Sequence, residues 1–178
     1  MSITITYFVH GTTTDNETKS CTGWLDGELS EKGIIQSKEL TEQIGNKQFD
    51  VIITSDLKRA IDSAKLTWHG REDIIHDSRI RECNYGKYNG AHKQFVVYEE
   101  HIEEPFKDGE CMKDVEKRVK NLIQELKQKY DEKQIAIVAH RAPQLALEVI
   151  TKDITWEQAI EKDWRKQKAW KPGWKYVI

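Results

Sequence analysis

The fold is decided near the start of the chain, by the stretch Ile3-Thr4-Ile5-Thr6-Tyr7-Phe8-Val9-His10-Gly11. Residues 3–9 are apolar or β-branched, a pattern typical of a strand that is buried on both faces of a parallel sheet. His10 and Gly11 follow at once, where such a strand gives way to a loop. Because ligands bind at the carboxyl ends of parallel strands, the stretch predicts a histidine at a ligand-binding edge.

Strand and helix patterns alternate along the rest of the chain. Further strands are predicted at residues 49–54, 74–75, 134–139 and, at a sheet edge, 174–178. Helices are predicted after the N-cap residue Ser30, after the pair Ser55-Asp56, over residues 112–130 and over residues 143–150. This alternation predicts an α/β fold, a three-layer sandwich whose doubly wound, mostly parallel sheet carries helices on both faces.

Length and composition favour one packed domain. The 178 residues fit a single domain over residues 1–178, with a short lid at the irregular segment of about residues 86–110. Hydrophobic residues make up 38% of the chain and charged residues 33%, which argues against disorder. We expect no nucleic-acid partner and no membrane partner, because the net charge is only -2 and no apolar run could cross a bilayer.

The cysteines and the first residues bear on where the protein works. Cys21, Cys83 and Cys111 are widely spaced and form no CxxC pair, which indicates neither a zinc site nor a disulfide framework. Residues 1–8 include no basic leader and are not typical of a signal peptide. The expectation is a cytoplasmic protein with reduced thiols, as a monomer or a homodimer.

Polar side chains follow the predicted strands at matching positions. The first strand ends in His10-Gly11-Thr12-Thr13, and the strand at 134–139 ends in His140-Arg141. Arg59 stands on the first turn of the helix that follows the strand at 49–54. One histidine after a strand is usually an ordinary core or surface residue, but two histidines and an arginine at matching strand ends favour a shared site.

These residues belong to a series of motifs that resembles the histidine phosphatase superfamily, the group that also contains cofactor-dependent phosphoglycerate mutases. The resemblance covers roughly residues 3–150 and runs in order through the chain. Its motifs are Val9-His10-Gly11-Thr12-Thr13, Asn16, Thr22-Gly23-Trp24, Ser55-Asp56-Leu57-Lys58-Arg59-Ala60, Arg79-Ile80-Arg81-Glu82, Gly109-Glu110 and Val138-Ala139-His140. Each motif is weak alone, and their order and spacing carry the resemblance.

The resemblance implies a role for each matched residue. His10 attacks phosphorus and forms a phosphohistidine, and Glu82 protonates the leaving oxygen and then activates water. Arg59 and His140 hold the transferring phosphoryl group. The implied phosphate or substrate contacts are Gly11, Thr12, Asn16, Thr22, Gly23 and Lys93. This scheme needs no metal and no cofactor.

The chain departs from the family at Val9, where the signature has an arginine that grips the phosphate. Losing that fork of donors should cost several kcal/mol of transition-state stabilisation unless another cation replaces it. Arg141, directly after His140, is the first candidate for that replacement, and Lys87 and Lys93 are others. The alternative is a weak or inactive site that only binds a phosphorylated ligand.

The expected function is hydrolysis of a small phosphorylated metabolite by a phosphomonoesterase. The segment between Glu82 and the helix at 112–130 is short, so water should reach the phosphohistidine. A phosphoglycerate mutase-type transfer is the alternative. Tryptophans and cations interleave over residues 156–174, which fits either a nucleic-acid surface or, as we favour, inward-packed tryptophans under outward lysines.

Overall fold

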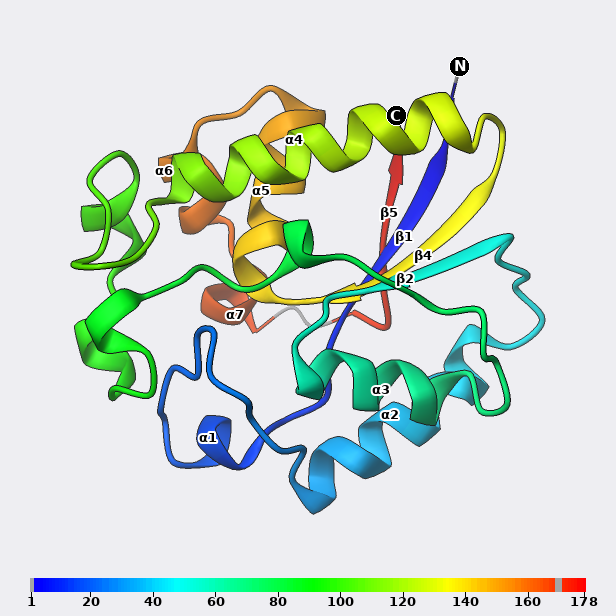
Figure 1. Cartoon of the computed structure of the whole chain (residues 1–178), viewed down its shortest axis with the longest axis horizontal. Coiled ribbons are helices and arrows are strands. Elements are labelled where there is room, and N and C mark those ends of the chain that lie inside the picture. The colour runs from blue at the N-terminus through cyan, green and yellow to red at the C-terminus, as the bar shows by residue number, and fades with distance from the viewer. Residues whose placement is uncertain (1, 169–170) are drawn as a thin grey trace.

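The central sheet follows the predicted pattern. The computed structural model describes residues 2–168 and 171–178 (Figure 1). Its strands are β1 (Thr4–Val9), β2 (Val51–Thr54), β3 (Ile75–His76), β4 (Gln134–Ala139) and β5 (Trp174–Val177). They lie in the order β3-β2-β4-β1-β5, and β5 pairs with β1 in the antiparallel direction while the other neighbours pair in parallel. The mostly parallel sheet is confirmed.

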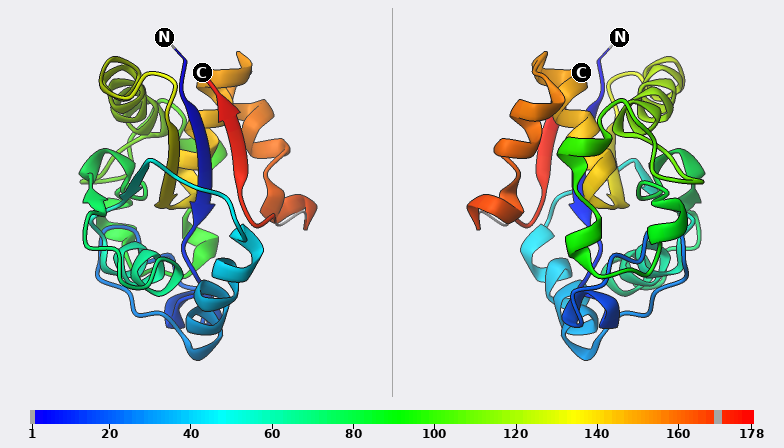
Figure 2. Two further views of the ribbon diagram at one scale, coloured as in Figure 1. Left: turned by 90° about the vertical axis from the view of Figure 1, so that its right-hand side faces the viewer. Right: turned by 90° about the vertical axis from the view of Figure 1, so that its left-hand side faces the viewer.

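Helices cover both faces of this sheet (Figures 1 and 2). One face carries α2 (Glu31–Ile44) and α3 (Lys58–Thr67), and the other carries α4 (Met112–Lys129), α5 (Arg141–Lys152) and α6 (Trp156–Glu161). Successive residues of a strand point to opposite faces of the sheet. Tyr7 and Ile137 belong to the core between the sheet and helices α4 and α5. Phe8 and Val138 belong to the core between the sheet and helices α2 and α3. This period of two is what a sheet buried on both faces requires. The three-layer sandwich is therefore confirmed.

Two helix starts differ from the prediction. α3 begins at Lys58 after Leu57, so Ser55 and Asp56 do not occupy its N-cap. Asp56 instead forms a bidentate ion pair with Arg81, with bonds of 2.7 and 2.6 Å. α5 begins at Arg141, two residues before Pro143, which is tolerated because the N–H groups of a first turn have no partner within the helix.

The segment at residues 86–110 contains three short 3-10 helices, at Gly86–Tyr88, Lys93–Phe95 and Tyr98–His101. Tyr98 and Phe106 are buried, so these two aromatics pack the segment down onto the core. The Lys93 N–H donates to the Lys19 carbonyl at 2.8 Å, and the Cys21 N–H donates to the Ala91 carbonyl at 2.8 Å. The segment is thus hydrogen-bonded to the loop that follows β1.

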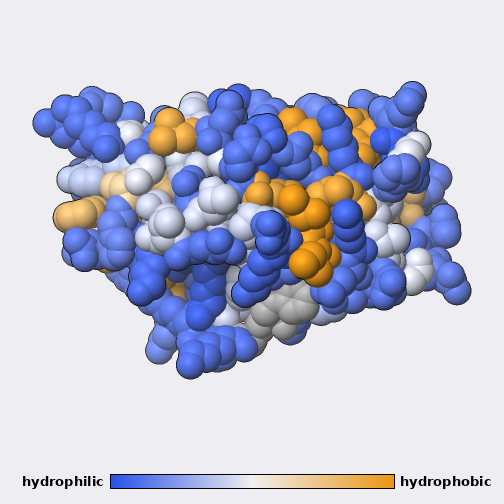
Figure 3. Space-filling view, turned by 90° about the horizontal axis from the view of Figure 1, so that it is seen from below, coloured by the Kyte–Doolittle hydropathy of each residue, from blue (hydrophilic) through white to orange (hydrophobic). Residues whose placement is uncertain are grey.

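The C-terminal part of the chain folds as α6, α7 (Trp164–Gln167) and β5. Trp156 is buried, and the rings of Trp164 and Trp174 lie 5.5 Å apart, which agrees with inward packing of these tryptophans. Trp170, part of the same pattern, lies outside the described residues. The face of the molecule that lies at the bottom of Figure 1 is mostly hydrophilic, with apolar side chains gathered near its middle (Figure 3). None of the helices in the described part is both long and apolar enough to cross a membrane.

Candidate active site

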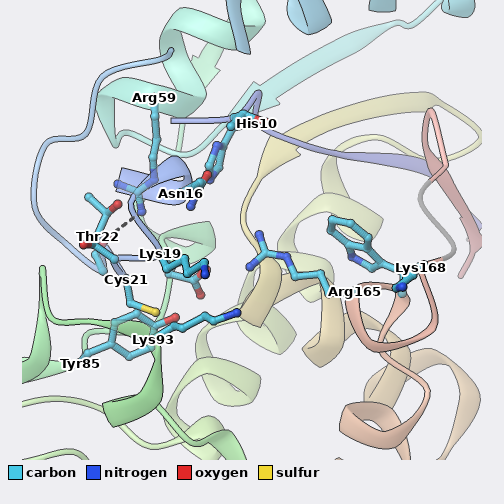
Figure 4. A pocket seen from close by; sticks show the side chains of 15 residues that line it. His10, Asn16, Lys19, Cys21, Thr22, Arg59, Tyr85, Lys93, Arg165 and Lys168 are labelled. Atoms are coloured by element: carbon cyan, nitrogen blue, oxygen red, sulfur yellow. Dashed lines mark hydrogen bonds between the residues drawn. The ribbon is translucent and has the colours of Figure 1, made fainter. Parts of the chain in front are cut away.

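A cavity of about 460 Å³ opens at the carboxyl ends of the strands (Figure 4). The loop after β1, the start of α3, the segment after Glu82 and the tail at α7 each contribute to its walls. Eight of the residues expected at the site line it: His10, Thr12, Asn16, Thr22, Gly23, Arg59, Glu82 and Lys93. Residues that are far apart in the sequence therefore meet where the strand-end argument places them.

His10 is held in one tautomer. Its Nδ1 lies 2.7 Å from the carbonyl oxygen of Gly11. A carbonyl only accepts hydrogen bonds, so Nδ1 carries the proton and Nε2 keeps its lone pair. Burial of the ring, and then the positive charge of Arg59, lower the pKa of His10 to about 3. At neutral pH His10 is an uncharged imidazole with a free Nε2, which is the form that acts as a nucleophile.

His140 lies beside His10, with ring centroids 5.0 Å apart and an interplanar angle of 59°. The side chain is fully buried, and neither ring nitrogen has a hydrogen-bond partner in the described part of the chain. Burial, followed by the charge of Arg59, holds the pKa of His140 well below its usual value. His140 is not among the residues that line the cavity. Because buried polar atoms are nearly always paired, its two unpaired ring nitrogens beside His10 indicate a place where a polar ligand can bind.

Arg59 presents a buried guanidinium to the cavity and is only 1% exposed. Its Nη1 donates to the Leu25 carbonyl at 3.0 Å and its Nη2 to the Gly23 carbonyl at 2.7 Å. Gly23 has a φ of +57°, and a Cβ there would lie 1.8 Å from the side-chain oxygen of Asn89, so only glycine fits. No carboxylate within residues 2–168 and 171–178 pairs with Arg59, and its charge is available to an anion.

Glu82 is fixed through one of its two carboxyl oxygens. Oε1 accepts hydrogen bonds from the Cys83 N–H at 2.8 Å, the Ala142 N–H at 3.1 Å and the Tyr98 hydroxyl at 3.3 Å. Oε2 has no partner among the residues that the structure describes, and the side chain lines the cavity. Three donors on Oε1 leave Oε2 as the carboxyl oxygen that is open to a ligand.

A known protein family matches most of this chain. A family model described as "Histidine phosphatase superfamily (branch 1)" matches residues 7–172. The chain belongs to this superfamily. The match covers the two histidines, Arg59, Glu82 and the tail as far as residue 172. The family that the sequence motifs resemble is therefore confirmed.

Individual members of the superfamily show the same likeness. Phosphoserine phosphatase 1 of Hydrogenobacter thermophilus is 29% identical over 136 residues, which are 70% of this chain and 64% of that relative. The chain thus spans less than two thirds of that relative's length. A 2,3-bisphosphoglycerate-dependent phosphoglycerate mutase of Corynebacterium kroppenstedtii is 36% identical over 90 residues, 47% of this chain and 36% of the mutase. The structure of a mycobacterial glucosyl-3-phosphoglycerate phosphatase matches with a TM-score of 0.76 at 27% identity, covering 89% of this chain and 84% of that one.

Two of the phosphate contacts expected from the sequence are already occupied within the protein. The Gly11 N–H donates to Ser63 Oγ at 2.9 Å, and the Thr12 N–H donates to Gln36 Oε1 at 2.9 Å. The loop lies so close to α2 that a Cβ on Gly33 would be 1.9 Å from the Thr12 carbonyl oxygen. The expectation that these two N–H groups face a phosphate is therefore corrected, because α2 and α3 use them to anchor the loop.

Other expected contacts remain open to a ligand. The Asn16 side-chain oxygen accepts from the N–H of Thr13, the N-cap of the short helix α1 (Thr14–Glu17), at 3.1 Å. The Asn16 amide nitrogen has no partner among the described residues. The backbone N–H groups of Thr22 and Gly23 have no partner in the described ranges. Lys93 lies at the cavity and is exposed. These groups offer donors from one wall of the cavity.

Arg141 is not among the residues that line the cavity. Its guanidinium binds Asp163, with Nε and Nη2 each 2.5 Å from Oδ2, and it lies 4.2 Å above the ring of Tyr98. Asp163 is 1% exposed, and a buried carboxylate needs a paired cation. Arg141, the first candidate for a replacement cation, is therefore paired with Asp163 and does not line the cavity, which corrects the expectation for Arg141.

The structure adds cavity residues that the sequence did not single out. Lys19 comes from the loop after α1, and Trp164, Arg165 and Lys168 come from the tail. Lys19 has a φ of +62°, a conformation that no local motif announces. The tail cations do not follow a predicted strand. The rule that ligands bind at the carboxyl ends of strands, which predicted His10 and His140, therefore does not predict them. Within the described residues, no group of three or more His, Cys, Asp or Glu side chains is placed to hold a metal ion.

Proposed function

We propose that the protein is a phosphomonoesterase that hydrolyses a small phosphorylated metabolite through a phosphohistidine on His10. The observation that carries the proposal is the hydrogen bond from His10 Nδ1 to the Gly11 carbonyl at 2.7 Å, because it leaves Nε2 unprotonated beside the cavity. The lowered pKa of His10 supports a neutral nucleophile at physiological pH. The membership of the chain in the histidine phosphatase superfamily supports the same reaction class.

In the first step, the lone pair of His10 Nε2 forms a bond to phosphorus while the bond from phosphorus to the leaving oxygen breaks. Glu82, protonated at Oε2, gives its proton to that oxygen, so the alcohol leaves uncharged. Arg59 and the ring of His140 bind the equatorial oxygens, whose negative charge they stabilise without having to reorganise. The products of this step are the alcohol, the phosphohistidine and the Glu82 carboxylate.

In the second step, a water oxygen attacks phosphorus and the bond from phosphorus to Nε2 breaks. The Glu82 carboxylate takes a proton from that water, which restores the acid and releases inorganic phosphate. His10 recovers its lone pair, and Nδ1–H keeps its bond to Gly11 throughout. The balance needs no further reactant, because each turnover consumes one ester and one water.

The cavity suits a small anionic ester. Its volume of about 460 Å³ admits a metabolite, and Lys19 and Lys93 add positive charge at its walls. Two of the relatives named above are, by their names, phosphatases of phosphoserine and glucosyl-3-phosphoglycerate, and each of those esters carries a carboxylate besides the phosphate. We therefore propose a substrate with a second anionic group, bound with the help of Lys93. Three free thiols, at Cys21, Cys83 and Cys111, favour the cytoplasm as its location.

The test is phosphate release from a panel of small phosphomonoesters in the presence of a chelator, with the wild type and His10→Ala compared. We expect release by the wild type and none above background by His10→Ala. An alkaline quench during turnover of a ³²P-labelled ester should trap label on the wild-type protein and none on His10→Ala. Equal release by both proteins would contradict the proposal.

Two other outcomes correspond to the alternatives. Transfer of the label to a second phosphorylated acceptor, faster than its release as phosphate, would identify a phosphoglycerate mutase-type enzyme. Binding of phosphate esters with neither release nor trapped label would identify a module that only binds its ligand.

A further inference from the structure

The phosphate site as described so far is short of positive charge. His10 and His140 are neutral, since their pKa values are lowered, and Arg59 is the buried cation between them and the loop after β1. A transferring phosphoryl group spreads negative charge over three equatorial oxygens. Val9 contributes no donor from its side chain, and Arg141 is committed to Asp163. A second guanidinium should therefore come from elsewhere.

Arg165 is placed to supply it. Arg165 lines the main cavity together with His10, Arg59 and Glu82. It also lines an adjoining hollow of about 190 Å³, whose walls include both Val9 and His10. Figure 4 shows its side chain extending from one wall of the cavity toward the wall that carries Lys19 and Lys93. Arg165 thus reaches the space beside the residue that stands in place of the signature arginine.

The charge of Arg165 is free, whereas two neighbouring cations are paired. Arg141 binds Asp163, and Lys166 binds Glu99 at 2.5 Å. The Arg165 guanidinium has neither a carboxylate partner nor a hydrogen bond to any residue that the structure describes, and its Cζ lies 5.2 Å from the centroid of the Trp164 ring. An unpaired guanidinium directed into a cavity beside a nucleophile matches the donor that a phosphate needs.

Asp163 fixes the backbone from which the Arg165 side chain projects. Its Oδ2 binds Arg141, and its Oδ1 accepts from the Arg165 N–H at 2.9 Å as the cap of α7. Asp163 is buried, and Arg141 is clamped between that carboxylate and the Tyr98 ring. The start of α7 is therefore attached through one carboxylate to the start of α5, directly after His140. Both arginines are hydrogen-bonded to Asp163, Arg141 through its guanidinium and Arg165 through its backbone N–H, but only Arg165 lines the cavity.

We propose that Arg165 binds the transferring phosphoryl group in the place that Val9 leaves without a cation. Arg141 is then a positioning residue, which acts through Asp163 on the direction of Arg165. This inference rests on the proposed function, since it names a further catalytic residue of the same site. The positive charge of Arg165 also contributes to the lowered pKa of His10, after burial and Arg59, and to that of His140. Its field therefore reaches both histidines.

The first experiment compares Arg165→Ala and Arg165→Lys with the wild type in phosphate release. Removing one donor from a transition-state charge lowers kcat/KM by about 100- to 1000-fold, which we expect for Arg165→Ala. Arg165→Lys should retain part of the activity, because it keeps the charge and loses the fork. The control is Lys162→Ala, which removes an exposed charge from the same tail outside the main cavity. It should stay within about twofold of the wild type, as surface changes usually do.

The second experiment measures binding of inorganic phosphate by calorimetry, which requires no turnover. Arg165→Ala should lose about tenfold or more in affinity, one charge-assisted contact being worth about 1.5–3 kcal/mol. If His10→Ala releases as much phosphate as the wild type, the proposed function fails. In that case the affinity for inorganic phosphate still tests whether Arg165 binds the phosphate. The inference is overturned if Arg165→Ala stays within threefold of the wild type in phosphate affinity.

The third experiment separates positioning from contact. Arg141→Ala should lower both the urea midpoint and kcat/KM, and the double variant with Arg165→Ala should be no less active than Arg165→Ala alone. Losses that multiply in the double variant would show that Arg141 contacts the phosphoryl group itself and would overturn its assignment as a positioning residue.

Discussion

The Tyr7 hydroxyl bonds to both backbone groups of His140: it accepts from the His140 N–H at 3.0 Å and donates to the His140 carbonyl at 2.7 Å. Tyr7 lies on β1, the strand that His10 follows, and His140 follows β4, the neighbouring strand. One phenol therefore fixes the relative positions of the two histidines. The free ring nitrogens of His140 depend on this bond for their direction, because the side chain has no hydrogen bond of its own in the described chain.

Tyr7→Phe should destabilise the protein and displace His140. The substitution leaves the buried His140 N–H without a partner, while the His140 carbonyl keeps only its bond from the Gln144 N–H at 3.3 Å. An unpaired buried N–H costs about 1–3 kcal/mol of unfolding free energy. We expect a lower urea midpoint with an unchanged m-value, and a lower kcat. Tyr88→Phe, at an exposed phenol, is the control and should change neither quantity. An unchanged urea midpoint in Tyr7→Phe would contradict the importance of this bond.

The stability of the protein should fall as the solution becomes acidic. The pKa of His10 is lowered from 6.5 to about 3, so between these values the unfolded state binds a proton that the folded state does not. The contribution of His10 to the free energy of unfolding is therefore fully present above pH 6.5 and is lost as the pH falls toward 3. Urea titrations of the wild type and His10→Asn should show a shallower decline in the variant. Parallel curves for the two proteins would contradict the lowered pKa.

Glu82→Gln should separate the proton transfer from the architecture. The glutamine oxygen can still accept from Cys83, Ala142 and Tyr98, so the urea midpoint should change little. The amide transfers no proton, and loss of a general acid–base lowers the rate by about 100- to 10,000-fold. The loss should be smallest for esters with acidic leaving groups such as p-nitrophenol, which depart without a proton. The same loss for alkyl and nitrophenyl esters would rule out Glu82 as the acid.

Lys93→Ala should weaken substrate binding and spare the chemical step. Exposed charge pairs contribute about 0.2–1 kcal/mol, so KM should rise up to about fivefold for esters with a second anionic group. The kcat should remain unchanged, and the difference in KM should shrink at high salt. Lys87→Ala removes a charge from the same segment outside the cavity and serves as the control. An equal rise in KM for both variants would indicate a general charge effect.

The sheet and the inner residues of the site follow from the sequence because their signals are local. Apolar runs mark the strands, and the polar residues directly after them must meet at one edge. The occupation of the Gly11 and Thr12 N–H groups is not a local property, since Ser63 and Gln36 reach them from two other helices. The choice between Arg141 and Arg165 depends on a buried Asp163, and burial of one carboxylate in a polar tail leaves no periodic trace.

The nucleophile and Arg165 come from opposite ends of the chain, and this separation has a consequence for biosynthesis. A nascent chain that has not yet extended to α7 already holds His10, Arg59, Glu82 and His140, and the hollow beside Val9 lacks its guanidinium. Contacts between distant segments form late in folding, since loop closure must precede them. Under our inference, full turnover thus requires that Arg165 has been translated and that the tail has docked. A protease cut that releases α7 should therefore lower turnover to about the level of Arg165→Ala, although His10, Arg59 and Glu82 remain in the chain.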